Sequence, residues 1–266
     1  MQALHQKVKE LLEAGTVQVV IGYGEGSNGK ARPVFIRNAA DADTLVWDER
    51  CHQNLAAFIN KPEIKKMGKS AIVAHPAAVR SIVQMIAENQ LRSDALVTLA
   101  VENETLEVLT DNLSLEKYAQ THPVYFPPFV VKEIDDIAKM SIPEKFEFWQ
   151  NELDKCFKCY ACRAACPLCY CERCIVECNQ PQWVSVPSTA QGNFQWHMNR
   201  AMHLAGRCIS CGSCTIACPV GIPIGLLTIE ASRIAQAEFG FEPGISCETS
   251  SAMSTFRVED KETFIK

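Results

Sequence analysis

The first 120 residues alternate short apolar runs with amphipathic stretches, which is the pattern of a small α/β domain. Apolar runs predict strands at 16–22, 33–36, 70–75 and 95–101. Helical periodicity lies at 55–59, at 79–86 and at 1–14, where the apolar face holds Leu4, Val8, Leu11 and Leu12. The order strand, helix, strand from 70 to 101 predicts a βαβ unit and therefore parallel strands.

A glycine-rich loop after the first predicted strand matches two phosphate-binding patterns. Gly24, Gly26 and Gly29 fit GxGxxG, and the same loop fits GxxxxGK. Both patterns need a helix directly after the loop, and the second needs Ser or Thr where Ala31 stands. Pro33 opens a strand-like run instead. The sequence therefore favours a glycine-rich hairpin loop over a nucleotide site.

The pattern changes after residue 120. The segment THPVYFPPF at 121–129 holds three prolines, and the chain beyond it is helical and rich in cysteine. We expect an α/β domain at 1–120 with a small parallel or mixed sheet, a linker or arm at 121–150, a mainly helical ferredoxin-like domain at 151–240, and a tail at 241–266. The first of these domains is expected to be a docking module.

Composition and charge narrow the class of protein. The chain has 266 residues and is 47% hydrophobic, which is the composition of a globular protein. Its net charge of -5 gives no support for nucleic-acid binding. No apolar run is long enough for a membrane span, and the first 14 residues are too charged for a signal peptide. Of 14 cysteines, all but Cys51 and Cys247 lie between Cys156 and Cys218. We expect a reducing cytoplasm in an oxygen-poor setting.

Two copies of the motif CxxCxxCxxxCP predict two 4Fe–4S clusters. In this motif three thiolates wrap one face of a cluster and the fourth cysteine binds the neighbouring cluster. Zinc sites favour two separated CxxC pairs, so zinc is the weaker interpretation. The predicted ligands of cluster one are Cys156, Cys159, Cys162 and Cys218. The predicted ligands of cluster two are Cys208, Cys211, Cys214 and Cys166.

Four further cysteines lie directly after the first motif, namely Cys169, Cys171, Cys174 and Cys178. Their CxCxxCxxxC spacing lets them close on one centre, and we expect a third 4Fe–4S cluster or a zinc ion there. Cys51 or Cys247 could replace one of the four ligands. The alternative, four buried core thiols, suits isolated cysteines better than a group of four.

Residues that could tune the clusters lie between the two motifs. His197 and His203 could donate a hydrogen bond to a cluster sulfur, although histidines on helices are usually paired within the protein. Basic residues outnumber acidic ones from 155 to 218, and positive charge favours a reduced cluster. Ordinary solvated helix charges explain the excess equally well. The basic residues are Lys155, Lys158, Arg163, Arg173, Arg200 and Arg207.

The cysteine motifs resemble those of dicluster ferredoxins, and the helical patterns around them resemble the α-helical ferredoxin domain of heterodisulfide reductase and succinate dehydrogenase iron–sulfur subunits. The order of an α/β domain, KCYACRAACPLCYC, PQW and HLAGRCISCGSCTIACPVGIPI is similar to that of β-type subunits of formate dehydrogenases and deazaflavin-linked hydrogenases. This resemblance implies a subunit that associates with a catalytic partner and a heterodisulfide-reductase-like complex.

No set of residues with catalytic spacing is evident, so we predict no catalytic residues. The predicted function is electron transfer through at least two 4Fe–4S clusters, between a catalytic oxidoreductase subunit and another electron carrier. A flavin is not expected. The alternative is a flavin- or deazaflavin-dependent oxidoreductase that holds the organic cofactor on the N-terminal domain near Gly24 or His75.

Overall fold

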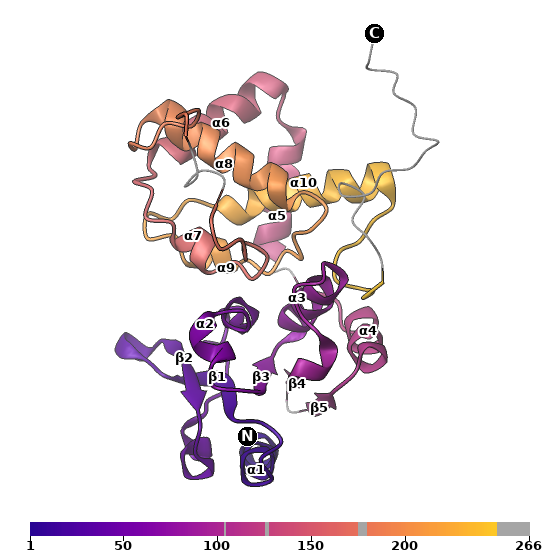
Figure 1. Ribbon diagram of the computed structural model, residues 1–266. Coiled ribbons are helices and arrows are strands. Elements are labelled where there is room, and N and C mark those ends of the chain that lie inside the picture. The colour runs from indigo at the N-terminus through magenta and orange to yellow at the C-terminus, as the bar shows by residue number, and fades with distance from the viewer. Residues whose placement is uncertain (104, 126–127, 175–179, 249–266) are drawn as a thin grey trace.

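A computed structural model describes the chain except for residues 104, 126–127, 175–179 and 249–266. A five-stranded sheet forms one part, and helices that carry the cysteine motifs form the other (Figure 1). The strands are β1 (Val19–Glu25), β2 (Ala31–Ile36), β3 (Ser70–Ala74), β4 (Leu96–Glu102) and β5 (Thr105–Leu109), in the order β2-β1-β3-β4-β5.

The sheet is mixed. β1, β3 and β4 are parallel, and β2 and β5 pair with them as antiparallel edges. The predicted βαβ unit is present as β3, α3 (Pro76–Ala87) and β4. Residues 55–59, expected as helix, form a 3-10 turn at Leu55–Phe58, followed by the short helix α2 (Pro62–Lys65).

The glycine-rich loop closes the hairpin between β1 and β2, as the sequence favoured. A 3-10 turn at Ser27–Gly29 joins the strands, and the Gly26 amide donates to the Lys30 carbonyl over 2.7 Å. Asn28 and Gly29 have φ of 56° and 70°, the left-handed conformation that asparagine and glycine tolerate best. No helix starts at this loop, so it lacks the helix N-terminus of a phosphate site.

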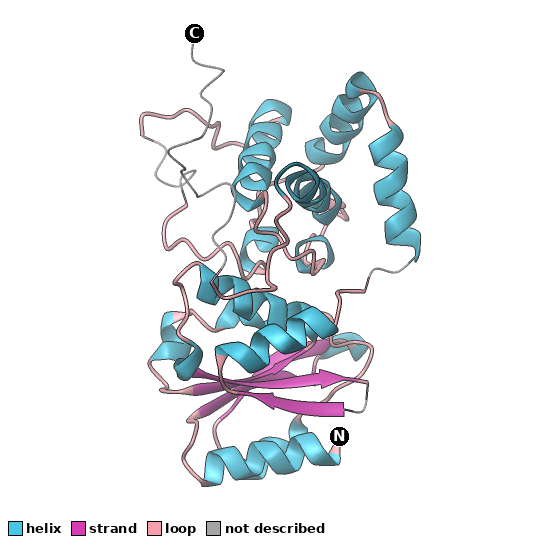
Figure 2. Ribbon diagram, turned by 90° about the vertical axis from the view of Figure 1, so that its right-hand side faces the viewer, coloured by secondary structure: helices cyan, strands magenta, loops and turns pink. Residues whose placement is uncertain are grey.

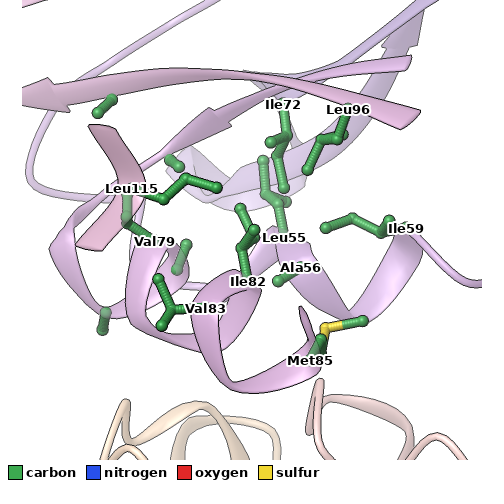
Figure 3. Close-up of a cluster of buried hydrophobic side chains, with 14 of the residues drawn as sticks. Leu55, Ala56, Ile59, Ile72, Val79, Ile82, Val83, Met85, Leu96 and Leu115 are labelled. Carbon is green, nitrogen blue, oxygen red and sulfur yellow. The ribbon is translucent and has the colours of Figure 1, made fainter. Parts of the chain in front are cut away.

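Helices cover both faces of the sheet (Figure 2). α1 (Gln2–Glu13) packs Leu4, Val8 and Leu11 into the core on one face. The other face packs against α3, the turn at Leu55–Phe58 and α4 (Asn112–Thr121). Figure 3 shows the side chains that fill this second core, among them Leu55, Ile72, Val79, Ile82, Val83, Leu96 and Leu115.

The helical part begins inside the segment expected as a linker. α5 (Pro128–Lys139) and most of α6 (Ile142–Asp154) lie within 121–150. They join α8 (Ala190–Leu204) and α10 (Ile224–Phe239) around a third core, which contains Trp149, Leu153 and Trp196. The short helices α7 (Ala161–Ala164) and α9 (Ser213–Ile216) lie inside the two cysteine motifs.

The two parts share one packed interface, because Leu168, Leu204 and Ile209 belong to the same core as α3 and the sheet. Arg207 joins them electrostatically: it pairs with Glu88, the residue after α3, over 2.6 Å. Within the described residues, no helix combines the length and apolar character needed to cross a membrane.

Candidate metal centre

The two cysteine motifs fold into the same backbone loop twice. Lys158 and Tyr160 have φ of 57° and 60°, and the equivalent Ser210 and Gly212 have φ of 63° and 74°. These left-handed residues turn the chain so that it curls back after each of the first two cysteines. Each loop ends in a one-turn helix, α7 or α9, that carries the third cysteine. The cysteine spacing predicts that the loops are alike, but not the left-handed residues that shape them.

Backbone amides in both loops point at sulfur. The amide of Lys158 donates to Cys156 Sγ over 3.3 Å, and the amide of Ser210 donates to Cys208 Sγ over 3.4 Å. The Ile222 amide adds a third such bond, to Cys218 Sγ at 3.3 Å. Amide donors stabilise negative charge on a thiolate, the form in which cysteine binds a metal.

One cavity is lined by Cys156, Cys159, Cys162 and Cys218. These are the four residues assigned to cluster one, and we call this space cavity one. It also touches Trp196, His197 and the two apolar side chains Phe157 and Val220. The last cysteine of the first motif, Cys166, is not among the residues that line it.

A second cavity of equal size, here called cavity two, is lined by Cys166, Cys208, Cys211 and Cys214. In both cavities the space between the lining atoms is about 380 Å³. The fourth cysteine of each motif thus lies at the cavity of the other motif. Within the described residues, no three His, Cys, Asp or Glu side chains are close enough to hold one metal ion; each set of thiols surrounds a space.

Three of the four thiols that line cavity two are weaker acids than an ordinary cysteine. Burial raises the pKa of Cys211 to about 11 and raises the pKa of Cys208 and Cys214 as well. In cavity one, burial raises the pKa of Cys162 to about 11. Positively charged iron would favour the thiolate form at both cavities, so the donor sets suit iron–sulfur clusters.

Two polar side chains of α8 are buried without the partners that such groups normally have. His197 is 3% exposed and both its ring nitrogens lack a hydrogen bond in the part of the chain that the structure describes. Burial lowers the pKa of His197 to about 3, so the ring is neutral. Arg200 is 7% exposed, and its Nε and Nη1 atoms likewise lack a partner there. Buried unpaired polar atoms beside cavities indicate missing ligands.

Protein partners exist for four of the other basic residues, namely Lys155, Lys158, Arg163 and Arg207. Lys158 is buried, and its Nζ donates to the carbonyls of Ser185, Val186 and Pro187. Lys155 pairs with Glu152, and Arg207 with Glu88. Of the six basic residues considered, Arg200 is the one whose buried nitrogens lack partners among the described residues.

The predicted third set is only partly described. Cys169 lies against Cys166, and the hydrogen bond between their sulfurs lowers the pKa of Cys166 and raises that of Cys169. Cys169 and Cys171 line a further cavity together with Cys166. Cys174 is half-buried, and Cys178 lies outside the described residues. The third site therefore stays a prediction.

The remaining candidates lie in different places. Cys51 is buried and donates to the Val46 carbonyl over 3.8 Å. Cys247 is buried beside Glu116, which accepts the Cys247 amide over 2.6 Å. His203 is exposed on the last turn of α8.

A larger apolar cavity lies between the two parts, next to cavity two. The space between its lining atoms is about 1650 Å³. His75, which follows β3, and Glu102, at the end of β4, line it from the sheet, and Cys211 lines it from the cysteine motif. Burial lowers the pKa of His75 to about 4, and its Nε2 atom lacks a partner among the described residues. The sequence named His75 as a place for an organic cofactor, but not this cavity.

Comparison with known proteins finds relatives for part of the chain. Over 120 residues it is 28% identical to an F420-dependent formate dehydrogenase subunit beta of Methanocaldococcus jannaschii, covering 44% of this chain and 31% of the relative. Over 127 residues it is 29% identical to an F420-dependent formate dehydrogenase 1 subunit beta of Methanococcus maripaludis, covering 47% and 32%. The chain thus spans about a third of the length of these curated relatives. No family model matches it.

Proposed function

We propose that this chain is an electron-transfer subunit that carries two 4Fe–4S clusters and passes electrons between a catalytic oxidoreductase partner and another carrier. The observation that carries this proposal is the pair of equal cavities, each lined by four cysteines drawn from both motifs. Such an arrangement suits two clusters in one fold, because each cluster would take three thiolates from one motif and the fourth from the other.

The residues present have clear roles if the clusters bind. A bound cluster supplies one-electron redox chemistry. Cys156, Cys159, Cys162 and Cys218 would hold cluster one, and Cys208, Cys211, Cys214 and Cys166 would hold cluster two. The amides of Lys158, Ser210 and Ile222 stabilise thiolate charge. Apolar side chains such as Trp196 and Leu204 exclude water from the cavities.

The third set would add a further centre. We propose that Cys169, Cys171, Cys174 and Cys178 hold a third 4Fe–4S cluster or a zinc ion. The proposal is supported by the position of Cys169 and Cys171 on a cavity adjoining Cys166. Four thiols left free beside redox centres would be prone to oxidation.

The partners follow from the relatives and from the surface. The relatives are named as beta subunits of formate dehydrogenases, so a catalytic formate dehydrogenase-type subunit is the proposed partner. A heterodisulfide-reductase-like subunit is the proposed second partner. Phe157 and Val220 are exposed apolar residues at the rim of cavity one, where a partner could approach the cluster. The sheet part, residues 1–120, would serve as a docking module and residues 151–240 as the cluster domain.

The proposal predicts how the pure chain behaves. After anaerobic reconstitution and reduction by dithionite, the protein should reduce a one-electron viologen or a similar dye, as followed by stopped-flow absorbance. It should not oxidise formate or another organic substrate by itself, because its redox chemistry is confined to the clusters. Turnover of an organic substrate by the flavin-free single chain would contradict the electron-transfer assignment.

The large apolar cavity supports a second candidate function, an oxidoreductase with a flavin or deazaflavin on the sheet part. Its apolar walls, the unpartnered His75 Nε2 and the adjoining Cys211 would suit a planar redox ring. The loop at Gly24 does not share this support, because it is a hairpin. A visible spectrum after acid release of the clusters decides between the candidates. Free flavin supports the second candidate, and its absence from native protein supports simple electron transfer.

A further inference from the structure

Helix α8 runs from one cavity to the other. Trp196 and His197 line cavity one, and one turn later Arg200 and Leu204 line cavity two. Side chains three residues apart lie on the same face of a helix. The face of α8 that points inward therefore serves both cavities with a short run of residues.

Arg200 lines cavity two and bonds to the backbone of a residue that lines cavity one. Its Nη2 donates to the backbone carbonyl of Cys162, a cluster-one cysteine, over 3.2 Å, while the side chain itself lines cavity two. The cysteines that interact with it are Cys169, Cys166, Cys214 and Cys162, which come from both ligand sets and from the third. His197 lies three residues earlier on α8 and lines cavity one.

The charge of Arg200 has no carboxylate counter-ion among the described residues. No Asp or Glu among the described residues forms an ion pair with it, and its Nε and Nη1 atoms are buried without hydrogen bonds there. A buried unpaired charge is strongly destabilising unless an anion lies beside it. A 4Fe–4S cluster with four thiolates is an anion. Cavity two adjoins this guanidinium, and the guanidinium bonds to the backbone of Cys162, which lines cavity one.

We propose that Arg200 is a positive charge shared by both clusters, which makes each cluster easier to reduce, while His197 acts on cluster one alone. This inference rests on the proposed function, since it requires clusters in both cavities. An electron added to either cluster adds one negative charge, and a nearby buried cation favours that state. Arginine suits the position because its planar fork can bond the Cys162 carbonyl and still direct other N–H groups at cavity two.

The test compares Arg200→Met with wild type in anaerobically reconstituted protein. Reduction of both clusters is followed by electron paramagnetic resonance in a redox titration. Both midpoint potentials should fall, so that at a fixed potential the reduced-to-oxidised ratio of each cluster drops by about tenfold or more. Tenfold corresponds to 59 mV for a one-electron couple. Arg92→Met removes the same charge from an exposed site, where the side chain is 83% exposed, and should shift neither potential.

Two further variants separate charge from structure. His197→Phe should lower the ratio for cluster one only, because His197 lines cavity one only. Arg200→Lys keeps the charge. The reduced-to-oxidised ratio of each cluster at the same fixed potential should therefore change by less than about threefold. If Arg200→Met fails to bind clusters, the Arg200→Lys variant serves as the test. Both midpoint potentials lowered in a fully loaded Arg200→Lys protein would contradict the proposal that the clusters share this charge.

The outcomes distinguish this inference from the proposed function. Wild type without iron and acid-labile sulfide after reconstitution would overturn the proposed function itself. Loaded wild type together with loaded Arg200→Met of unchanged potentials would overturn the role of Arg200 alone. A fall confined to one cluster would contradict the claim that both share the charge.

Discussion

Cys166 and Cys218 occupy equivalent positions as the last cysteine of each motif, and each lines the cavity formed by the other motif. The short helix α7 or α9 directs the chain away from its own cavity after the third cysteine. Cys166 and Cys218 therefore tie the two motif loops together. The crossed ligand sets proposed above make a specific prediction about which cluster each cysteine supports.

Replacing Cys166 with Ala should remove cluster two and spare cluster one, because Cys166 lies at cavity two. The residual paramagnetic spectrum of the reduced variant should match that of Cys214→Ala, which also damages cluster two. Cys218→Ala is the matched control and should leave the same residual spectrum as Cys162→Ala. A Cys166→Ala spectrum that matches Cys162→Ala instead would show ligation within one motif and overturn the crossed sets.

The sequence alone predicts two cysteine sets and names His197 and Arg200 among several candidates, but it does not single out those two. Cysteine spacing is set by the ligand positions of a cluster, so the eight cysteines are readable from the chain. His197 and Arg200 lie on a helix whose apolar periodicity is weak, and nothing in their spacing says which cavity each side chain faces. Their importance follows from burial without partners, which only the folded chain reveals.

At the scale of elements, hydrogen bonds at the C-terminal end of α3 join the sheet part to the cysteine motifs. The Glu88 carboxylate accepts hydrogen bonds from Arg207 at 2.6 and 2.7 Å and from Tyr170 at 2.6 Å. Tyr170 lies between Cys169 and Cys171, and Arg207 directly precedes Cys208. Glu88 thus bonds to a residue between Cys169 and Cys171 and to the residue that precedes the second motif.

Replacing Glu88 with Gln should lower the free energy of unfolding by about 2 kcal/mol at pH 7, because it removes charge-assisted bonds from a largely buried pair. Burial alone would raise the pKa of Glu88, but the bonds from Arg207 and Tyr170 outweigh it and lower the pKa. The folded carboxylate thus stays charged to lower pH than the unfolded one. The contribution of this carboxylate to the free energy of unfolding is full above the ordinary carboxyl pKa of about 4.3. It is lost as pH falls through the lower pKa of the folded protein.

Denaturant unfolding of both proteins from pH 7 down to pH 4 measures this contribution. The difference between wild type and Glu88→Gln should stay constant down to about pH 5 and narrow below it. Asp94→Asn is the control, because Asp94 forms an exposed pair with Arg92, and exposed ion pairs contribute little to stability. An equal loss in both variants, or a difference that grows at low pH, would contradict the role of the Glu88 pair.

Three of the strands that the sequence predicted are buried on both faces. β1, β3 and β4 are continuous apolar runs, and each is found within a few residues of its predicted range. β5 was missed because it is an edge strand whose exposed Glu107 and Val108 break the apolar run. The sequence predicted a linker where α5 lies, because of the prolines before this helix. Pro128 is nevertheless compatible with the first turn of a helix.

At the scale of the whole molecule, the sheet part and the cluster part are joined by a continuous core and by ion pairs, so cavity two lies close to the sheet. The backbone amide of Asn54, just before the 3-10 turn at Leu55–Phe58, donates to Ser213 Oγ over 2.9 Å. Ser213 directly precedes Cys214, which lines cavity two. This interface could not be read from the sequence, because Asn54 and Ser213 are separated by 159 positions. It places the large apolar cavity where a partner or an organic molecule would meet cluster two.

The most direct test of the two-cluster account is a count of iron, zinc and acid-labile sulfide in the anaerobically reconstituted full chain. Two clusters predict about eight irons and about eight sulfides per chain. A third cluster at Cys169, Cys171, Cys174 and Cys178 raises both counts to about twelve, and a zinc ion there adds about one zinc to eight irons. Protein that stays without acid-labile sulfide after reconstitution would contradict the account.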